Sequence, residues 1–235
     1  IMFLESVKPL NWIASQLILV LEPFYAWVFG YRELIDFRRA LNKRESVPIL
    51  IEKIEQYERE RIEKSISGDI PDSIPVSFWN HFPVDDQSPD TLARSTIQFQ
   101  RNYDLDFIKV SPSSSFCIRD WGADDIWRGN LEGTRDYLEP VIKKPEDWKN
   151  LDVLNPRKGS LGNQLETLKI IKKEFGSATP IIQTIFNPLS QAKNLVGKPN
   201  LFLHIRKHSA ALAEGLNTIA ETTYAFIREC QRIGI

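Results

Sequence analysis

Residues 59–79 limit the fold more than any other stretch, because a helical pattern gives way there to a strand pattern. A charged run stops at Gly68, and prolines mark the turn that follows. Beyond the turn, Ile74, Val76 and Phe78 alternate with other residues. A glycine just past a helical run is a helix stop, and alternation of period two predicts a strand. This order predicts the start of an α/β domain.

Strands and helices continue to alternate along the rest of the chain. The predicted strands are 74–80, 105–110 and 180–186. Helices are predicted from the Ser88 cap to Tyr103, at 144–147, over 161–175 with a stop at Gly176, after the Asn187 cap, and over 212–230. Residues 121–141, rich in glycine and aromatic side chains, predict a loop or hairpin excursion. Such alternation favours a parallel sheet or barrel.

We therefore predict an α/β fold over residues 57–235, a partial (β/α)₈ barrel of the TIM type. A complete barrel takes about 250 residues, so we expect this chain to hold only its first half. Residues 1–56 predict a small all-helical segment, to which we assign no role. Its apolar stretch 10–29 is long enough to cross a bilayer. Glu22 and Pro23 would then lie in the hydrocarbon, so we expect a buried or interfacial helix and no transmembrane span.

Composition excludes several classes of protein. The chain has 235 residues, of which 42% are hydrophobic and 26% charged, and its formal net charge is −1. Such values are typical of a globular protein and disfavour a nucleic-acid partner, which would call for a basic face. The two cysteines, Cys117 and Cys230, are too few for a disulfide framework or a four-cysteine zinc site, and we expect a cytoplasmic protein.

The chemistry of parallel α/β barrels lies at the carboxyl ends of the strands, which selects three clusters here. The first holds Trp79 as a substrate-binding candidate, with Asn80 and His81 as catalytic candidates. The His81 imidazole suits proton transfer near neutral pH. The alternative is a loop histidine that hydrogen-bonds to backbone.

The second and third clusters are substrate-binding candidates. The second holds Lys109, Ser111, Ser113 and Ser115, and the third is Asn187. A lysine within an apolar strand needs a partner, either a substrate carboxylate or an acid such as Asp106. The serines can bind an anion or form a flexible polar loop. Asn187 opens a helix whose free N–H groups attract anions, although capping alone explains it.

Other polar residues favour structural roles. Cys117 has no neighbouring base and is predicted to be a buried apolar side chain. His204 and His208 have metal-ligand spacing but lack a third ligand, so we predict no metal site there. For Arg119, Asp120, Asp124 and Asp125 we expect ion pairs on a solvated surface.

Three segments together resemble the uroporphyrinogen decarboxylase-like family. They are RERIEKSISGDIPDSIPVSFW (59–79), DLDFIKVSPSSSFCIRDWGADD (104–125) and TPIIQTIFNPLSQAKNLVG (179–197). The resemblance implies a (β/α)₈ barrel that binds a tetrapyrrole at its strand ends and decarboxylates it without a cofactor. It also implies a pair of arginines after the first strand and an aspartate after the second.

The chain departs from that pattern at both places. Residues 80–84 contain no arginine, and Ser113 stands near the slot of the aspartate. The alternative is the family's other branch, methyltransferases that use zinc and a corrinoid, with a homodimer or a corrinoid protein as partner and a methylated small molecule as substrate. Their His and Cys zinc ligands are expected in the second half of the barrel. A third alternative is a catalytically inactive binding fragment.

Overall fold

The computed structural model of the protein describes residues 59–130, 132–176 and 179–235. The predictions for residues 1–56 lie outside the described residues. Two compact units share the described chain. The first consists of residues 59–75 and 99–106, and the second of residues 76–98 and 107–235. No helix within the described residues is long and apolar enough to cross a membrane.

A buried arginine organises the first unit. Residues 59–67 are helical, and Arg61 on this helix is only 5% exposed. Its guanidinium donates to both carboxylate oxygens of Asp72, at 2.8 and 2.6 Å, and to the buried carboxylate of Asp106. The hydrogen bonds to the two acids raise the pKa of Arg61, although its burial opposes this. Asp106, one of the alternative partners considered for Lys109, therefore pairs with Arg61.

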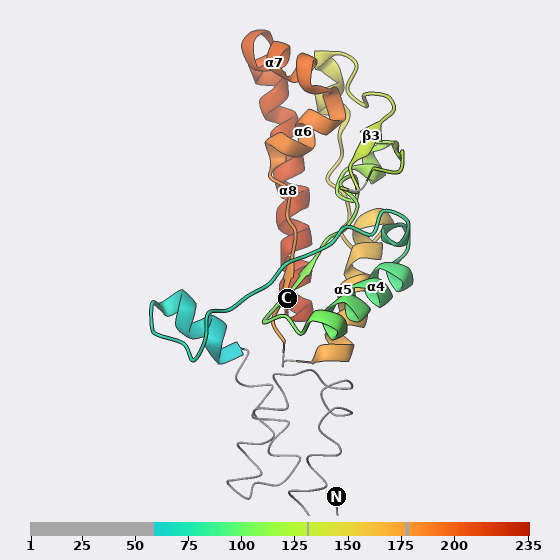
Figure 1. Ribbon diagram of the computed structural model, residues 1–235. Coiled ribbons are helices and arrows are strands. Elements are labelled where there is room, and N and C mark those ends of the chain that lie inside the picture. The colour runs from blue at the N-terminus through green and yellow to red at the C-terminus, as the bar shows by residue number, and fades with distance from the viewer. Residues whose placement is uncertain (1–58, 131, 177–178) are drawn as a thin grey trace, which may run out of the picture. The chain divides into compact units, whose positions relative to one another are not determined.

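Helices dominate the second unit (Figure 1). In chain order its elements are η1 (Asp85–Gln87), α4 (Pro89–Tyr103, of which residues 99–103 are assigned to the first unit), β1 (Ile108–Val110), η2 (Arg119–Trp121), β2 (Asp125–Trp127), β3 (Arg135–Tyr137), η3 (Pro145–Asn150), α5 (Gly159–Phe175), β4 (Ile181–Gln183), α6 (Pro188–Val196), α7 (Lys198–Lys207) and α8 (Ser209–Ile233). The fold is mixed helix and sheet. Helix α8 packs against η3, α5, α6 and α7.

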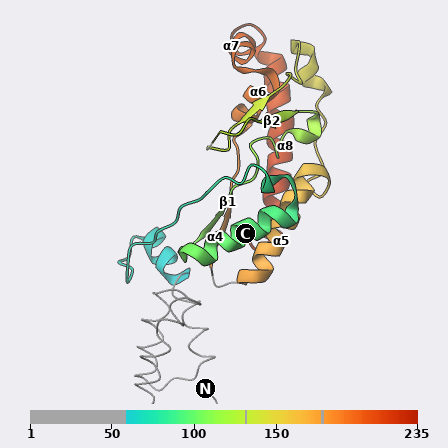
Figure 2. The same ribbon diagram turned by 45° about the vertical axis from the view of Figure 1, so that its right-hand side comes forward.

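Two small sheets are present among the described residues (Figure 2). Strands β1 and β4 pair in parallel, with Ile108 opposite Ile181 and Lys109 opposite Ile182. Strands β2 and β3 form an antiparallel hairpin, with Ile126 opposite Asp136. The parallel pairing of the second and third predicted strands is thus confirmed, and so is the hairpin excursion.

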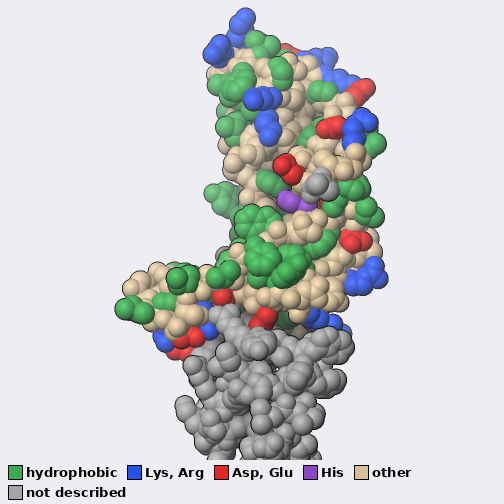
Figure 3. All heavy atoms as spheres, in the orientation of Figure 1, with side chains coloured by type: hydrophobic (Ala, Val, Ile, Leu, Met, Phe, Trp, Pro, Cys, Tyr) green, Lys and Arg blue, Asp and Glu red, His purple; other side chains and the backbone are tan. Residues whose placement is uncertain are grey.

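The predicted strand 74–80 is wrong. Residues 74–80 are extended but join no ladder, and the Ile74 and Trp79 side chains are 82% and 51% exposed. Figure 3 shows that hydrophobic side chains also lie at the surface of the described part of the molecule. Within the second unit, the Ser77 hydroxyl donates to the Phe107 carbonyl at 2.7 Å, which holds the segment near β1 without a ladder. The parallel sheet has two strands within the described residues, so a half barrel of three parallel strands is not formed by that part of the chain.

Helix ends follow the predicted caps. Ser88 Oγ accepts a hydrogen bond from the Thr91 N–H at 3.4 Å, and Asn187 Oδ1 accepts one from the Ser190 N–H at 2.8 Å. Gly176 ends α5 with φ of +60°, a conformation that a side chain would strain. The predicted start of α4 and α6 and the end of α5 are therefore confirmed.

The core of the second unit is built around Trp148 of η3. This fully buried side chain packs so closely on Gly215 of α8 that a Cβ there would lie 2.4 Å from Trp148 Cε3. Its indole N–H donates to His204 Nδ1 at 2.9 Å, so His204 is a buried hydrogen-bond acceptor. Cys117 is also buried, as predicted, and burial raises its pKa to about 12.

Candidate functional site

The loop that follows β1 is a tight turn rather than a flexible polar segment. Ser111, Ser113 and Ser115 are all at least 95% buried. The Phe116 N–H donates to the Ser113 carbonyl at 3.2 Å, and Ser113 Oγ lies 3.4 Å from Ser115 Oγ. Ser111 Oγ is buried without a hydrogen-bond partner among the described residues. Hydroxyl groups are therefore held in fixed positions at the carboxyl end of β1.

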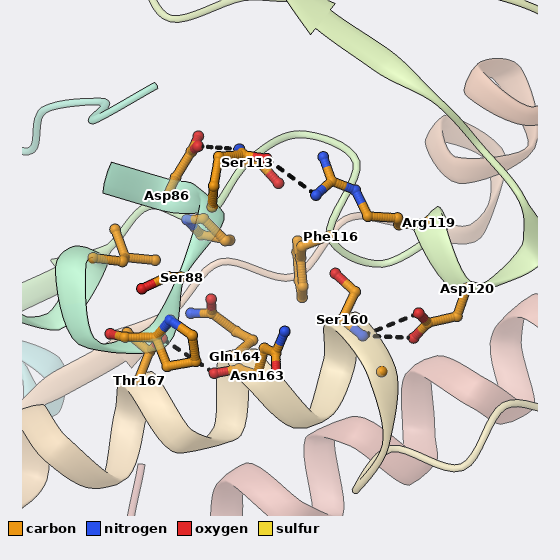
Figure 4. A pocket seen from close by; sticks show the side chains of 15 residues that line it. Asp86, Ser88, Ser113, Phe116, Arg119, Asp120, Ser160, Asn163, Gln164 and Thr167 are labelled. Carbon is orange, nitrogen blue, oxygen red and sulfur yellow. Dashed lines mark hydrogen bonds between the residues drawn. The ribbon is translucent and has the colours of Figure 1, made fainter. Parts of the chain in front are cut away.

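A polar cavity of about 290 Å³ opens beside this loop (Figure 4). Ser113 and Phe116 form one wall, and Asp86 and Ser88 line it from the turn before α4. The first turns of α5 supply hydroxyl and amide groups from Ser160, Asn163, Gln164 and Thr167. Such a lining can hold a small polar molecule through hydrogen bonds.

The α5 end of the cavity already carries an anion. The Asp120 carboxylate accepts the Ser160 N–H with both oxygens, at 3.0 and 2.9 Å. Gly159 has φ of +56°, and a Cβ there would lie 2.4 Å from that carboxylate. Asp120 thus satisfies the free Ser160 N–H of the first turn, and only glycine fits at position 159 beside it. This helix start is not a site for a second anion.

A buried ion network fixes the opposite wall. Arg135 of β3 donates to Asp125 Oδ1 at 3.0 Å, to Asp86 Oδ1 at 2.7 Å and to the Pro83 carbonyl at 2.5 Å. The side chains of Arg135, Asp86 and Asp125 are 5%, 4% and 0% exposed. Arg119 Nη2 lies 3.5 Å from the Asp125 carboxylate. Asp125 is therefore buried, and the prediction of a solvated surface ion pair is wrong for it.

Tyr137 also ties the hairpin to the β1 loop. Its hydroxyl lies 3.2 Å from Ser114 Oγ and accepts from Asn194 Nδ2 of α6 at 2.9 Å. Burial raises the pKa of Tyr137 to about 12, so the phenol is neutral at physiological pH. The hydroxyl therefore connects the hairpin, the loop and α6.

Lys109 lies outside this cavity, on the open face of the β1–β4 sheet. We use this name for the face opposite the one on which Ile108 and Val110 are buried. Lys109 Nζ lies 3.3 Å from the ring centroid of Trp79, a cation–π contact. Burial lowers the pKa of Lys109. The structure thus brings two predicted site residues together, one from the extended segment and one from β1.

The remaining predicted residues lie elsewhere. His81 is exposed and contacts the hairpin turn, because a Cβ on Gly133 would lie 2.6 Å from His81 Cβ. Asn80 is exposed, and Asn187 caps α6. Neither His81, Asn80 nor Asn187 lines the cavity beside Ser113.

Most of the cavity lining was not predicted. Asp86, Ser160, Asn163, Gln164 and Thr167 were missed, although the last four have helical spacing opposite an apolar stripe. A polar stripe on a helix that otherwise packs in a core can be recognised in the sequence, and it indicates a helix face that lines a polar cavity. Asp86 gives no such signal, because its partner Arg135 is distant in sequence.

Comparison with known proteins gives the family. Residues 80–234 match the family described as uroporphyrinogen decarboxylase (URO-D). The chain belongs to the URO-D family. A methylcobamide:CoM methyltransferase, MtbA, of Methanosarcina acetivorans is 31% identical over 72 residues, which are 31% of this chain and 21% of that protein.

A solved structure of a methyltransferase from Methanosarcina mazei has the same fold as this URO-D family member. The TM-score is 0.65 at 17% sequence identity, over 75% of this chain and 56% of that one. The chain thus spans about a fifth of the curated relative and about half of the solved one.

The methyltransferase branch implies a zinc ion, and the described residues can be checked for a group of side chains that could bind it. Within residues 59–130, 132–176 and 179–235, no three His, Cys, Asp or Glu side chains are grouped so that they could hold a metal ion. His204 and His208 are neighbours, with ring centroids 5.6 Å apart, but His204 Nδ1 is occupied by Trp148. These residues do not fit a zinc site, and we assign zinc no step.

Proposed function

We propose that this URO-D family protein takes part in corrinoid-dependent methyl transfer and does not decarboxylate uroporphyrinogen. One observation carries the proposal: the residues that follow the extended segment and β1 lack the charges that decarboxylation calls for. Residues 80–84 contain no arginine, and the slot expected for an aspartate holds Ser113.

The charges nearby do not replace those that are missing. A tetraanionic substrate calls for several cations, because unpaired carboxylates are costly to remove from water. Arg135 is already bound to Asp86 and Asp125, and Arg119 lies against Asp125. Asp86 and Asp120 line the cavity, but Asp86 is paired with Arg135 and Asp120 accepts the Ser160 N–H. Neither is therefore a free counter-charge for a protonated pyrrole. The named relative and the solved structure, both methyltransferases, support the same choice.

The roles proposed for this chain are binding and positioning. Ser113 and the amides of Asn163 and Gln164 would hold polar groups of a small substrate in the cavity. His81 does not line the cavity, so we propose no proton transfer by it there. A corrinoid, carried by a partner protein, would supply or accept the methyl group.

The test compares the two reactions on one preparation of the purified protein. Methylcobalamin is incubated with 2-mercaptoethanol as the methyl acceptor, and loss of the methylated corrinoid is followed by absorbance. Uroporphyrinogen III is incubated in parallel, and coproporphyrinogen is measured. We expect demethylation above the protein-free rate and no coproporphyrinogen.

Two results would contradict the proposal. Coproporphyrinogen formation would restore the decarboxylase interpretation. Absence of both reactions would favour an inactive binding protein. Asn80→Arg serves as a control, because one added cation leaves Ser113 and the rest of the site unchanged and should not produce decarboxylation.

A further inference from the structure

Lys109 occupies an unusual place in the sheet. Its strand neighbours Ile108 and Val110 are 3% and 0% exposed, so their side chains belong to the core. Successive side chains of a strand point to opposite faces, and Lys109 therefore lies on the open face. Its register partner there is Ile182, which is 45% exposed. A cation thus stands beside apolar surface that solvent reaches.

The ammonium group of Lys109 has no carboxylate partner among the described residues. Asp106, the acid nearest in sequence, is bound to Arg61. The contact described for Lys109 is the Trp79 ring, and neither Trp79 nor Ile182 titrates. Burial without a counter-ion explains why the pKa of Lys109 is lowered. An anion placed here would find a cation whose water shell is already reduced.

Ser111 provides a second observation that points to a ligand. It follows β1 directly and is 5% exposed, and its hydroxyl makes no hydrogen bond within the described part of the chain. Buried hydroxyl groups nearly always have a partner. Strand alternation, continued by one residue past Val110, puts Ser111 on the side of Lys109. The ammonium group of Lys109 within β1 and the unsatisfied hydroxyl of Ser111 just after β1 are therefore on the same side of the strand.

We propose that Lys109, Ser111 and Trp79 form a binding site for a carboxylate attached to a planar apolar body. Lys109 binds the carboxylate, Ser111 donates a hydrogen bond to it, and the exposed Trp79 ring packs against the apolar part. A single ammonium suits one carboxylate rather than several. This site is separate from the cavity beside Ser113, and the inference goes beyond the proposed function without resting on it.

Lys109 is then the residue that selects a charged ligand at this site. If the cation–π contact with Trp79 were the only role of Lys109, that role would be structural. Charged and neutral ligands would then bind with the same affinity. Binding of a carboxylate does make one, because a charge-assisted hydrogen bond is stronger than a neutral one. Discrimination between an acid and its amide therefore separates the two interpretations.

The experiment measures binding of benzoate and benzamide, which have the same shape and differ in charge. Ligand-observed NMR titration follows each compound with the wild type, Lys109→Met, Lys109→Arg and Lys169→Met. Lys169 is a matched control on the surface of α5, where it pairs with Glu166 at 2.6 Å. We expect wild type and Lys169→Met to bind benzoate at least about tenfold more tightly than benzamide.

Lys109→Met should bind both compounds equally, and Lys109→Arg should keep most of the preference for benzoate. Equal binding of benzoate and benzamide by the wild type would overturn the proposal, and so would unchanged benzoate binding by Lys109→Met.

A pH titration of the wild type also tests whether the Lys109 ammonium group binds the carboxylate. It needs no substituted protein, so it does not depend on whether a variant folds. Benzoate affinity should fall as the pH rises and Lys109, whose pKa is lowered by burial, loses its proton, while benzamide affinity stays constant. Parallel pH profiles for the two compounds would contradict a role for the ammonium group. Neither titration needs a corrinoid or turnover, so failure to bind benzoate and failure of methyl transfer are separate results.

Discussion

Arg135→Met is the sharpest test of how the cavity wall is held. The substitution keeps an unbranched apolar stem but leaves two carboxylates, Asp86 and Asp125, buried without their shared cation. Removal of one partner from a buried ion pair costs about 3–5 kcal/mol. Arg119 stays near Asp125 at 3.5 Å and offsets part of this, so we expect a loss of about 3 kcal/mol.

The same hairpin supplies a matched control. Arg128 pairs with Asp136 at 2.8 Å, but these side chains are 64% and 67% exposed. Exposed pairs contribute about 0.2–1 kcal/mol, so Arg128→Met should cost less than 1 kcal/mol. The two variants make the same chemical change and differ in burial.

Urea unfolding gives the free-energy difference, and amide hydrogen exchange in β2 and β3 separates local opening from global unfolding. The triple variant Arg135→Met, Asp86→Asn, Asp125→Asn should recover part of the loss, because it removes the buried charges. If Arg135→Met costs no more than Arg128→Met, the network does not hold the wall and our description of it is wrong.

Three further predictions concern the core and the caps. Gly215→Ala should lower the free energy of unfolding by about 1–3 kcal/mol, because the added Cβ would lie 2.4 Å from Trp148. In a Trp148→Ala background the same change should be neutral or stabilising by up to about 1 kcal/mol, and equal effects in both backgrounds would refute the clash. Burial lowers the pKa of His204 below its ordinary 6.5, so the unfolded chain binds more protons just below that pH. The free energy of unfolding, relative to His204→Gln, should therefore fall as the pH drops from 6.5 toward the folded-state pKa, and a rise would reverse our sign. Asn187→Ala should cost about 1 kcal/mol in thermal unfolding and Asn187→Ser much less; a changed benzoate affinity in Asn187→Ser would give Asn187 more than a capping role.

Local signals in the sequence predicted the helices well. Ser88, Asn187 and Gly176 act through their own backbone and the next few residues, so the information that places them is adjacent in the chain. The parallel pairing of β1 with β4 was also predictable, because alternating strands and helices leave few topologies open.

The failures share a physical cause. A strand exists only as part of a ladder with a neighbouring strand, and residues 74–80 have the alternation of a strand but are assigned to no strand in the structure. Burial of Asp125 depends on Arg135, and the partner of Asp106 is Arg61, far away in sequence. Such pairings are set by packing between distant segments, which periodicity does not report. The cavity was missed for the same reason, since its walls come from three separate segments.

The pairing of Ile108 with Ile181 has a consequence for how the protein folds. These strands are separated in sequence by the hairpin, η3 and α5, so their ladder closes a very long loop. Contacts between distant residues slow folding, whereas helices form within their own stretch of chain. We therefore expect α5 and α8 to form early and the β1–β4 ladder to close late, so that the open face and its lysine are completed at the end of folding.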